Sequence, residues 1–331
     1  MLGARIQNPV SGIQNAVSRL LLVDGHAYAY RAFHAIRGLH SPAGRPTNAI
    51  YGFVQMMRRL VGAELRVGSC EFRVELGTRN SKLGTRAFTH VAVVWDGGLA
   101  AERVAALPQY KAQRPPLPPA LAEQLDGVVA WLEAAGFASF CRDAVEADDW
   151  IATLARQAER ADWAVVIASS DKDFMQLVSD RVGLVNPGDP TQSLWSAEQV
   201  RKKTGVAPSQ IVDWLSLVGD SVDNIPGVPG VGVKTAAELL GELGSVAGLY
   251  ARLGEVKSER LRAALTAAAA DVGRNQALVR LKTDLPGAFS PEELAVRAPR
   301  TDRLRELYSG WGFRSLLAEL GPAAAAQSEL L

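Results

Sequence analysis

Three apolar runs that end in aspartate are the feature that most constrains the fold of this chain. The run "RLLLVDG" ends at Asp24, "THVAVVWDGG" ends at Asp96, and "WAVVIASSDKD" leads into Asp171 and Asp173. Short apolar runs without alternation are typical of strands buried on both faces of a parallel sheet. Helical patterns lie between and beside them, over residues 47–60, 119–135 and 146–159. The sequence therefore predicts a doubly wound, mostly parallel α/β sheet, in which the three acidic strand ends meet at one edge.

The second half of the chain has a different pattern, because the strand signal ends at about Trp195. Patterns typical of short helices follow, over residues 196–203, 209–218, 234–243, 258–269 and 301–308. Ser196 and Gln199 have the spacing of a capping box at the start of the first of them. We therefore expect an N-terminal extension over 1–18, a sheet domain over 19–195, a helical subdomain over 196–290, and C-terminal helices with a tail over 291–331.

The segment "LGTRNSKLGTR" repeats LGTR after seven residues and has neither helix nor strand periodicity. A polar tandem unit of this kind is typical of a duplicated surface insertion, so residues 67–89 are interpreted as an excursion from the sheet domain. The alternating pattern of "CEFRVEL" within it also allows an ordinary hairpin.

Composition excludes several classes of protein. The two cysteines, Cys70 and Cys141, lack CxxC spacing, and the four histidines are scattered, so neither a disulfide framework nor a zinc site is supported. No run approaches the roughly 20 apolar residues of a membrane helix, and the N-terminus lacks the apolar core of a signal peptide. We therefore expect a cytoplasmic protein with no membrane partner.

Nine acids stand at the strand ends and helix starts: Asp24, Asp96, Glu146, Asp148, Asp149, Asp171, Asp173, Asp220 and Asp223. Any one of them alone is more often a solvated surface acid or a helix N-cap. That reading does not account for acids closing three separate apolar strands. If the carboxylates converge, they repel by several kcal/mol even at an effective dielectric of about 20, so such a cluster needs cations.

The chemistry of these acids favours two hard cations. All-oxygen ligands favour Mg²⁺ or Mn²⁺ over zinc or copper, and nine carboxylates exceed what one octahedral Mg²⁺ uses. Two such metals are the arrangement that hydrolyses phosphodiesters. The net charge is only +1, but setting these nine of the 35 acidic residues aside leaves 36 basic residues against 26 acidic ones. An excess of this kind suits a polyanionic substrate.

The stretch "GDSVDNIPGVPGVGVKTA" places acids beside a glycine loop that leads into a helix. Bare backbone N–H groups at a helix N-terminus bind anions. The stretch therefore suggests metal and phosphate side by side, although a glycine loop alone more commonly means a turn with a C-cap.

Six blocks, in order, resemble the 5′ nucleases of the flap endonuclease superfamily, most closely the bacterial 5′→3′ exonuclease domain found in DNA polymerase I and in free-standing homologues. The blocks are "LLVDGHAYAYRAFHAI", "NAIYGF", "WDGG" with the following "ER" and "PQYKAQR", "VEADDWIATLA", "ASSDKDFMQLV" and "LVGDSVDNIPGVPGVGVKTA". The resemblance covers roughly residues 20–286. It implies a PIN-like nuclease domain with a helical arch over 97–120, and a helix-three-turn-helix in the helical subdomain. It also implies cleavage of DNA at 5′ flaps, nicks or 5′ ends in replication and repair.

The resemblance also implies roles for individual residues. Asp24, Asp96, Glu146 and Asp148 would hold the first Mg²⁺ or Mn²⁺, and Asp171, Asp173, Asp220 and Asp223 would hold or surround the second, with Asp149 as an accessory acid. The residues implied near the scissile phosphate are Lys111, Arg114, Arg31 and Arg103, with Tyr30 stacking on a base. The residues implied in duplex binding are Gly227, Gly230, Gly232, Lys234 and Thr235, with a K⁺ ion bridging loop carbonyls to phosphate.

The chain departs from the family pattern in its 67–89 excursion, in its extension over residues 1–18, and in having no polymerase after it. We therefore expect a separate DNA polymerase and ligase as partners, and a location at the bacterial nucleoid. Two alternatives stay open. The first is a PIN-like ribonuclease, which shares strands that end in acids but lacks the glycine-lysine loop. The second is a non-catalytic DNA-junction binder, against which the presence of all nine acids argues.

Overall fold

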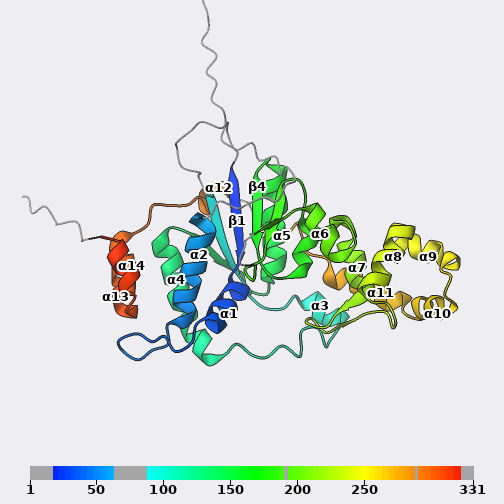
Figure 1. The fold of residues 1–331 in the computed structure, drawn as a ribbon, viewed down its shortest axis with the longest axis horizontal. Helices are drawn as coiled ribbons and strands as arrows, with labels where there is room; N and C mark the ends of the chain where they lie inside the picture. The colour runs from blue at the N-terminus through cyan, green and yellow to red at the C-terminus, as the bar shows by residue number, and fades with distance from the viewer. Residues whose placement is uncertain (1–17, 63–87, 190–192, 288–289, 322–331) are drawn as a thin grey trace, which may run out of the picture.

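The computed structural model describes residues 18–62, 88–189, 193–287 and 290–321 (Figure 1). The extension up to residue 17, the excursion up to residue 87 and the tail from residue 322 lie outside these described residues, and so do the predictions made for them. Among the helices of the described ranges, none has both the length and the apolar character that a membrane span needs.

A six-stranded sheet with the order β3-β2-β1-β4-β5-β6 forms the centre of the molecule. The strands are β1 (Arg19–Asp24), β2 (His90–Trp95), β3 (Ala138–Cys141), β4 (Ala164–Ala168), β5 (Val182–Val185) and β6 (Leu194–Trp195). Neighbouring strands are parallel except β5 and β6, which are antiparallel. The three strands expected from the sequence are β1, β2 and β4, so the mostly parallel sheet is confirmed.

Residues of β1 alternate between two apolar cores, one on each face of the sheet. Leu20 and Leu22 belong to one core, Leu21 and Val23 belong to the other, and all four are fully buried. Because both faces are covered, none of these four positions is free for a polar side chain, which explains the apolar run between Arg19 and Asp24.

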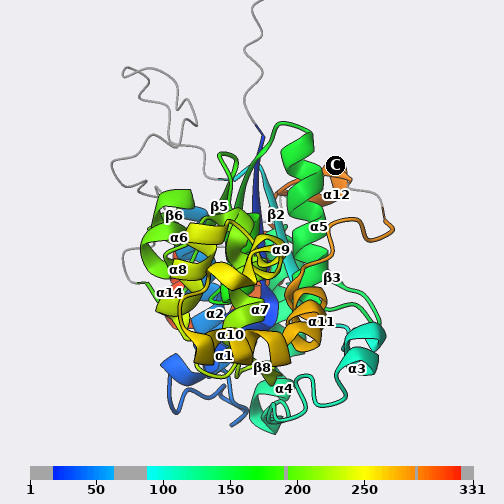
Figure 2. The same cartoon turned by 90° about the vertical axis from the view of Figure 1, so that its right-hand side faces the viewer.

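Helices cover both faces of the sheet, as a doubly wound fold requires (Figures 1 and 2). One face carries α1 (Gly25–Ala35), α2 (Asn48–Gly62), α4 (Pro119–Ala135), α13 (Thr301–Trp311) and α14 (Arg314–Glu319). The other carries α5 (Ala147–Arg160), η1 (Lys172–Leu177), α6 (Ala197–Thr204) and α7 (Ile211–Val218). Helix α4 begins with Pro119 in its first turn and ends at Gly136, whose φ of 81° is left-handed, which explains why its predicted bounds agree with the structure.

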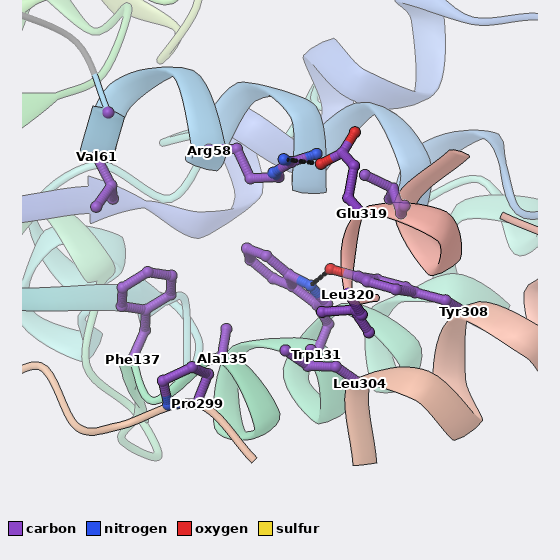
Figure 3. A pocket seen from close by; sticks show the side chains of 12 residues that line it. Arg58, Val61, Trp131, Ala135, Phe137, Pro299, Leu304, Tyr308, Glu319 and Leu320 are labelled. Atoms are coloured by element: carbon purple, nitrogen blue, oxygen red, sulfur yellow. Dashed lines mark hydrogen bonds and ion pairs between the residues drawn. The ribbon is translucent and has the colours of Figure 1, made fainter. Parts of the chain in front are cut away.

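The C-terminal helices α13 and α14 pack on α4 and α2, at the opposite end of the molecule from α8–α10 (Figure 1). Figure 3 shows the contact from close by: the indole Nε1 of Trp131 donates to the hydroxyl of Tyr308 at 2.9 Å, and Arg58 of α2 pairs with Glu319 of α14. These helices therefore extend the core of the sheet domain.

The helical part after the sheet projects from the end of the molecule that faces the viewer in Figure 2. Its remaining elements are η2 (Pro208–Gln210), β7 (Gly219–Asp220), β8 (Ile225–Pro226), α8 (Val233–Leu243), α9 (Val246–Ala251), η3 (Leu253–Glu255), α10 (Glu259–Ala267) and α11 (Ala269–Val279). Two short helices lie elsewhere: α3 (Ala101–Ala106), within the range 97–120 for which the resemblance implies an arch, and α12 (Pro291–Leu294) beside β2. The capping box of α6 is present, with Ser196 N donating to Gln199 Oε1 at 3.0 Å.

Candidate active site at the carboxyl edge of the sheet

Asp24 and Asp96 are fixed at the ends of neighbouring parallel strands. Asp24 closes β1 and caps α1, because its Oδ1 accepts from Ala27 N at 3.0 Å while its Oδ2 accepts from Ser169 Oγ at 2.9 Å. Asp96 follows β2, and its Oδ1 accepts from Ala147 N at 2.8 Å, at the start of α5. The strand ends thus point two carboxylates to one edge.

Asp148 and Asp171 complete a first group of carboxylates with these two, although Asp171, which the resemblance assigns to the second metal, has its pKa raised by burial and also by the charges of Asp223 and Asp220. The pKa of Asp24 is raised to about 6, chiefly by burial and in smaller part by the charges of Asp96 and Asp171, while the hydrogen bonds from Ala27 and Ser169 oppose the rise. Burial also raises the pKa of Asp148 well above its usual range, with the nearby charge of Asp171 as the next cause. Carboxylates whose ionisation is mutually opposed in this way lie within each other's fields, as a cation site requires.

A second group consists of Asp173, Asp220 and Asp223, all of them buried. One carboxylate oxygen from each lies within 4.8 Å of the others. Burial and then the charge of Asp171 raise the pKa of Asp173 well above its usual range. The Oδ1 of Asp173 is buried with no hydrogen-bond partner among the described residues. A buried orphaned oxygen facing other carboxylates is the arrangement that a divalent cation satisfies.

Glu146 differs from the expectation that it is a ligand of the first metal. Its Oε2 accepts from Lys111 Nζ at 2.5 Å and from the Tyr110 hydroxyl at 3.1 Å, while its Oε1 pairs with Arg103 NH1 at 3.1 Å. Although burial opposes the charge, Lys111 and Arg103 hold the pKa of Glu146 down at about 2. Both oxygens are engaged by protein donors, so Glu146 holds the ammonium of Lys111 and the guanidinium of Arg103 in this structure.

Asp149 and Arg103 form a buried pair away from both carboxylate groups. Arg103 NH2 donates to Asp149 Oδ1 at 2.7 Å, and the same oxygen accepts from Lys282 N at 2.9 Å. The Arg103 side chain is only 5% exposed, and it also donates to the carbonyl of Arg280. The expectation that Arg103 faces a scissile phosphate therefore differs from this structure, in which carboxylates and a carbonyl occupy its guanidinium.

Of the four basic residues expected near the scissile phosphate, Lys111 and Arg114 are the two that lie beside the two carboxylate groups. Lys111 Nζ lies 3.9 Å from an oxygen of Asp148 and 3.9 Å from one of Asp223, so it stands between the two carboxylate groups. Arg114 NH2 pairs with Asp223 while its side chain stays 40% exposed. Tyr30 and Arg31 form no hydrogen bond or ion pair with the nine acids in the described ranges; the Tyr30 ring stacks on His34, with centroids 6.4 Å apart.

The turn that carries Lys111 is bonded to the hairpin that carries Asp223. Lys111 N donates to Asp223 O at 3.0 Å, and Asn224 Nδ2 donates to Gln109 O at 2.9 Å. Lys111 and Asn224 both have left-handed φ values, 55° and 58°, which persist because the surrounding contacts fix them. The position of the lysine thus depends on a segment more than 100 residues further along the chain.

The glycines of the loop before α8 have two different roles. A Cβ on Gly227 would stand 2.1 Å from the carbonyl oxygen of Val218, so this glycine permits close packing inside the loop, in contrast to the DNA contact expected of it. Gly230, with φ 83°, and Gly232 have no atom within 4 Å of an added Cβ, and Lys234 is exposed beside them. Gly230, Gly232 and Lys234, with the half-buried Thr235, therefore present an open backbone surface at the N-terminus of α8.

Three residues near the acids were missed from the sequence. Ser169 donates to Asp24, Lys172 Nζ lies 3.0 Å from Asp220 Oδ1, and His26 Nδ1 accepts from the backbone N of Asp96 at 3.2 Å. The run "SSDKD" carries the first two, so a search for donors beside the acids of that run could have found them.

Comparisons with known proteins agree with this geometry. A family model described as 5′-3′ exonuclease, N-terminal resolvase-like domain, matches residues 19–205, and one described as 5′-3′ exonuclease, C-terminal SAM fold, matches residues 206–302. DNA polymerase I of Bacillus caldotenax is 34% identical over 304 residues, and the thermostable DNA polymerase I of Thermus thermophilus is 36% identical over 303. The alignments cover 91% and 92% of this chain, which spans about a third of the length of these relatives.

Solved structures show the same fold at lower identity. T5 5′-exonuclease with bound divalent metal ions (zinc) aligns with a TM-score of 0.59 at 21% identity, covering 91% of this chain and 98% of that one. The catalytic core of Rad2 in complex with DNA substrate aligns with a TM-score of 0.58 at 16% identity, covering 92% of both chains.

Proposed function

Because this chain belongs to the 5′→3′ exonuclease family, we propose that it is a metal-dependent, structure-specific 5′ nuclease. It hydrolyses phosphodiester bonds of DNA at 5′ ends, nicks and flaps, in replication and repair. The observation that carries the proposal is the convergence of two carboxylate groups at one sheet edge, with Lys111 between them. A DNA polymerase and a ligase that complete the repair reaction are proposed as partners, in keeping with the DNA polymerase I relatives.

Two Mg²⁺ or Mn²⁺ ions are the proposed cofactors. The residues present fit such ions, because the donors are all carboxylate oxygens and one of them, Asp173 Oδ1, is buried without a partner. The first group, with Asp24, Asp96, Asp148 and Asp171, and the second, with Asp173, Asp220 and Asp223, would each hold one ion. When bound, two divalent ions supply an activated water and stabilise the leaving oxygen.

The chain's own cations bind and orient the phosphate. Lys111 places a fixed positive charge between the carboxylate groups, and its ion pair with Glu146 keeps that ammonium in position. Burial opposes the charge of Lys111, but the pKa of its ammonium is raised by Asp148 and Glu146, so it stays protonated throughout the working pH range. Arg114 is partly exposed beside Asp223, where it can reach a phosphate oxygen from solvent.

The loop before α8 is proposed to hold the duplex. Gly230 and Gly232 leave the backbone accessible, and the N-terminus of α8 with Lys234 favours an anion. A K⁺ ion bridging loop carbonyls to a DNA phosphate belongs to this proposal, and replacing K⁺ by Na⁺ at constant ionic strength should weaken duplex binding. The hairpin that carries Asp220 and Asp223 leads directly into this loop. Binding of the duplex by the loop therefore also positions the scissile bond at the carboxylate groups.

The decisive experiment compares cleavage of a 5′-labelled DNA flap, a nicked duplex and single-stranded RNA, with Mg²⁺, with Mn²⁺ and with EDTA. We expect metal-dependent cleavage of the flap and loss of that cleavage by orders of magnitude in Asp171→Asn. The matched control is Asp162→Asn, because Asp162 is 84% exposed and remote from the site. Cleavage of RNA alone would support the ribonuclease alternative, and metal-independent flap binding without cleavage would support a junction binder.

A further inference from the structure

A cavity of about 270 Å³ lies between α1, α2 and the turn over residues 187–189, apart from the acids. Its wall includes Tyr28, Arg31, Ile36, Met56, Arg59 and Pro187. Ligand pockets for drug-sized molecules begin at about 300 Å³, so this cavity has the size for a smaller unit, such as one nucleotide.

Three polar side chains around this cavity, those of Tyr28, Arg31 and Arg59, have no partner among the described residues. The hydroxyl of Tyr28 is buried, since the residue is 1% exposed, and it has no hydrogen-bond partner among the described residues. Arg31 and Arg59 are exposed and form no ion pair or hydrogen bond within the described ranges. By contrast, the neighbouring Arg58 lines a different cavity and pairs with Glu319 (Figure 3). Two unpaired guanidinium groups and an orphaned hydroxyl on one cavity indicate a missing anion.

The rest of the wall is mainly apolar. Ile36, Met56 and Pro187 contribute carbon surface, while Asp189 reduces the net charge of the lining to +1. An inorganic anion alone would not need this apolar wall, whereas a nucleotide has a flat apolar base attached to a phosphate.

The position of the cavity connects it to the acids. Helix α1 begins directly after Asp24, and Arg31 lies seven residues further along it, about 10 Å at the rise of an α-helix. Tyr28 lies between them. A strand whose scissile phosphate stood at the acids could therefore reach the cavity with a phosphate one or two nucleotides away.

We propose that this cavity binds one nucleotide, with its phosphate on Arg31, Arg59 and the Tyr28 hydroxyl and its base against Ile36, Met56 and Pro187. The proposal rests on the proposed nuclease function, because that function brings the nucleotide to the cavity. That source is either a nucleotide of the bound DNA strand or a free 5′-mononucleotide released by cleavage. The recognised chemistry, a base with a phosphate, is the same in both.

The test measures binding to a fluorescein-labelled flap DNA by anisotropy in EDTA, with 5′-dAMP as a competitor in a second arm. The variants are Tyr28→Phe and Arg59→Gln, and the matched control is Arg58→Gln, which changes the same charge on the same helix. We expect Kd to rise about 3- to 10-fold for Arg59→Gln, with the log–log salt slope reduced by about one. Arg58→Gln should bind as the wild type does, because its exposed pair contributes little to stability.

Tyr28→Phe separates a ligand-binding role from a structural one. Its hydroxyl has no partner in the protein, so removing it should leave the melting temperature unchanged or higher while DNA or dAMP affinity falls several-fold. Weaker flap binding with unchanged dAMP binding assigns the cavity to the DNA strand, and the converse assigns it to the product. Wild-type affinity of both Tyr28→Phe and Arg59→Gln in both arms would overturn the proposal. Because binding is measured without metal, that outcome is distinct from a wild-type protein that fails to cleave.

Discussion

Replacing Arg103 by methionine tests whether this arginine holds the protein together or contacts substrate. The guanidinium lies 2.7 Å from Asp149, 3.1 Å from Glu146 and 3.1 Å from the backbone carbonyl of Arg280. The side chains of Arg103, Asp149 and Glu146 are each at least 95% buried. Methionine keeps most of the volume, so the loss is electrostatic. Removing one partner of a buried ion pair costs about 3–5 kcal/mol, because the remaining charges stay buried.

The assay is urea unfolding followed by tryptophan fluorescence in EDTA. With a denaturant slope of about 3 kcal/mol/M, a loss of about 4 kcal/mol lowers the unfolding midpoint by more than about 1 M. Arg114→Met is the matched control: Arg114 is 40% exposed, so its loss should cost under about 1 kcal/mol while reducing flap cleavage sharply. An Arg103→Met protein with the wild-type midpoint but without cleavage would refute the structural role and place the guanidinium on the substrate.

Four further outcomes are expected. Asp173→Asn should raise the melting temperature of the metal-free protein, because it removes a buried charge from a crowded group, and it should abolish cleavage while duplex affinity measured by anisotropy holds or improves. The pKa of Asp24 is raised from 3.8 to about 6, so its contribution to stability is fully present below about pH 3.8 and is lost as pH rises through 6; in EDTA the melting temperature of Asp24→Asn should therefore rise relative to that of the wild type between about pH 4 and pH 6. Lys234→Ala should reduce the log–log salt slope of duplex binding by about one, and Gly230→Val should weaken that binding, since φ is 83° there; an unchanged slope would place Lys234 off the DNA. Thr89 belongs to the sheet rather than to the expected excursion, because its N donates to Arg19 O at 3.1 Å and its Oγ1 accepts from Arg19 N at 3.0 Å. Deleting residues 67–87 through a glycine-serine linker should leave folding and cleavage intact and weaken long-duplex binding only at low salt, and an unfolded deletion protein would contradict the insertion hypothesis.

The sheet and its acidic edge were predictable because two independent signals coincide there. The unbroken apolar runs of β1, β2 and β4 fix the strands, and parallel strands bring their final residues to a common edge. Strands β3, β5 and β6 were missed because they are only four, four and two residues long, which is too short for a periodic signal.

The sequence could not predict which acids of "EADD" face the other carboxylates and which face Arg103. Residues at the start of a helix point in directions about 100° apart, and nothing in the letters says which direction faces the sheet edge. In the structure Asp148 faces the other carboxylates, whereas Glu146 and Asp149 face Arg103. Gly227 could not be assigned from the sequence for a similar reason. The sequence does not distinguish a glycine packed against a carbonyl of its own chain from a glycine that contacts a phosphate.

The bonds between the Lys111 turn and the Asp223 hairpin have a consequence for the order in which the protein is made. Synthesis from the N-terminus releases the sheet acids and Lys111 first, yet Lys111 N has its partner, the Asp223 carbonyl, only after residue 223 has emerged. The second carboxylate group likewise lacks two of its three members until then. A growing chain therefore carries most of the sheet domain without the complete candidate active site, and under the proposed nuclease function we expect nascent or prematurely terminated products to leave the DNA around them intact.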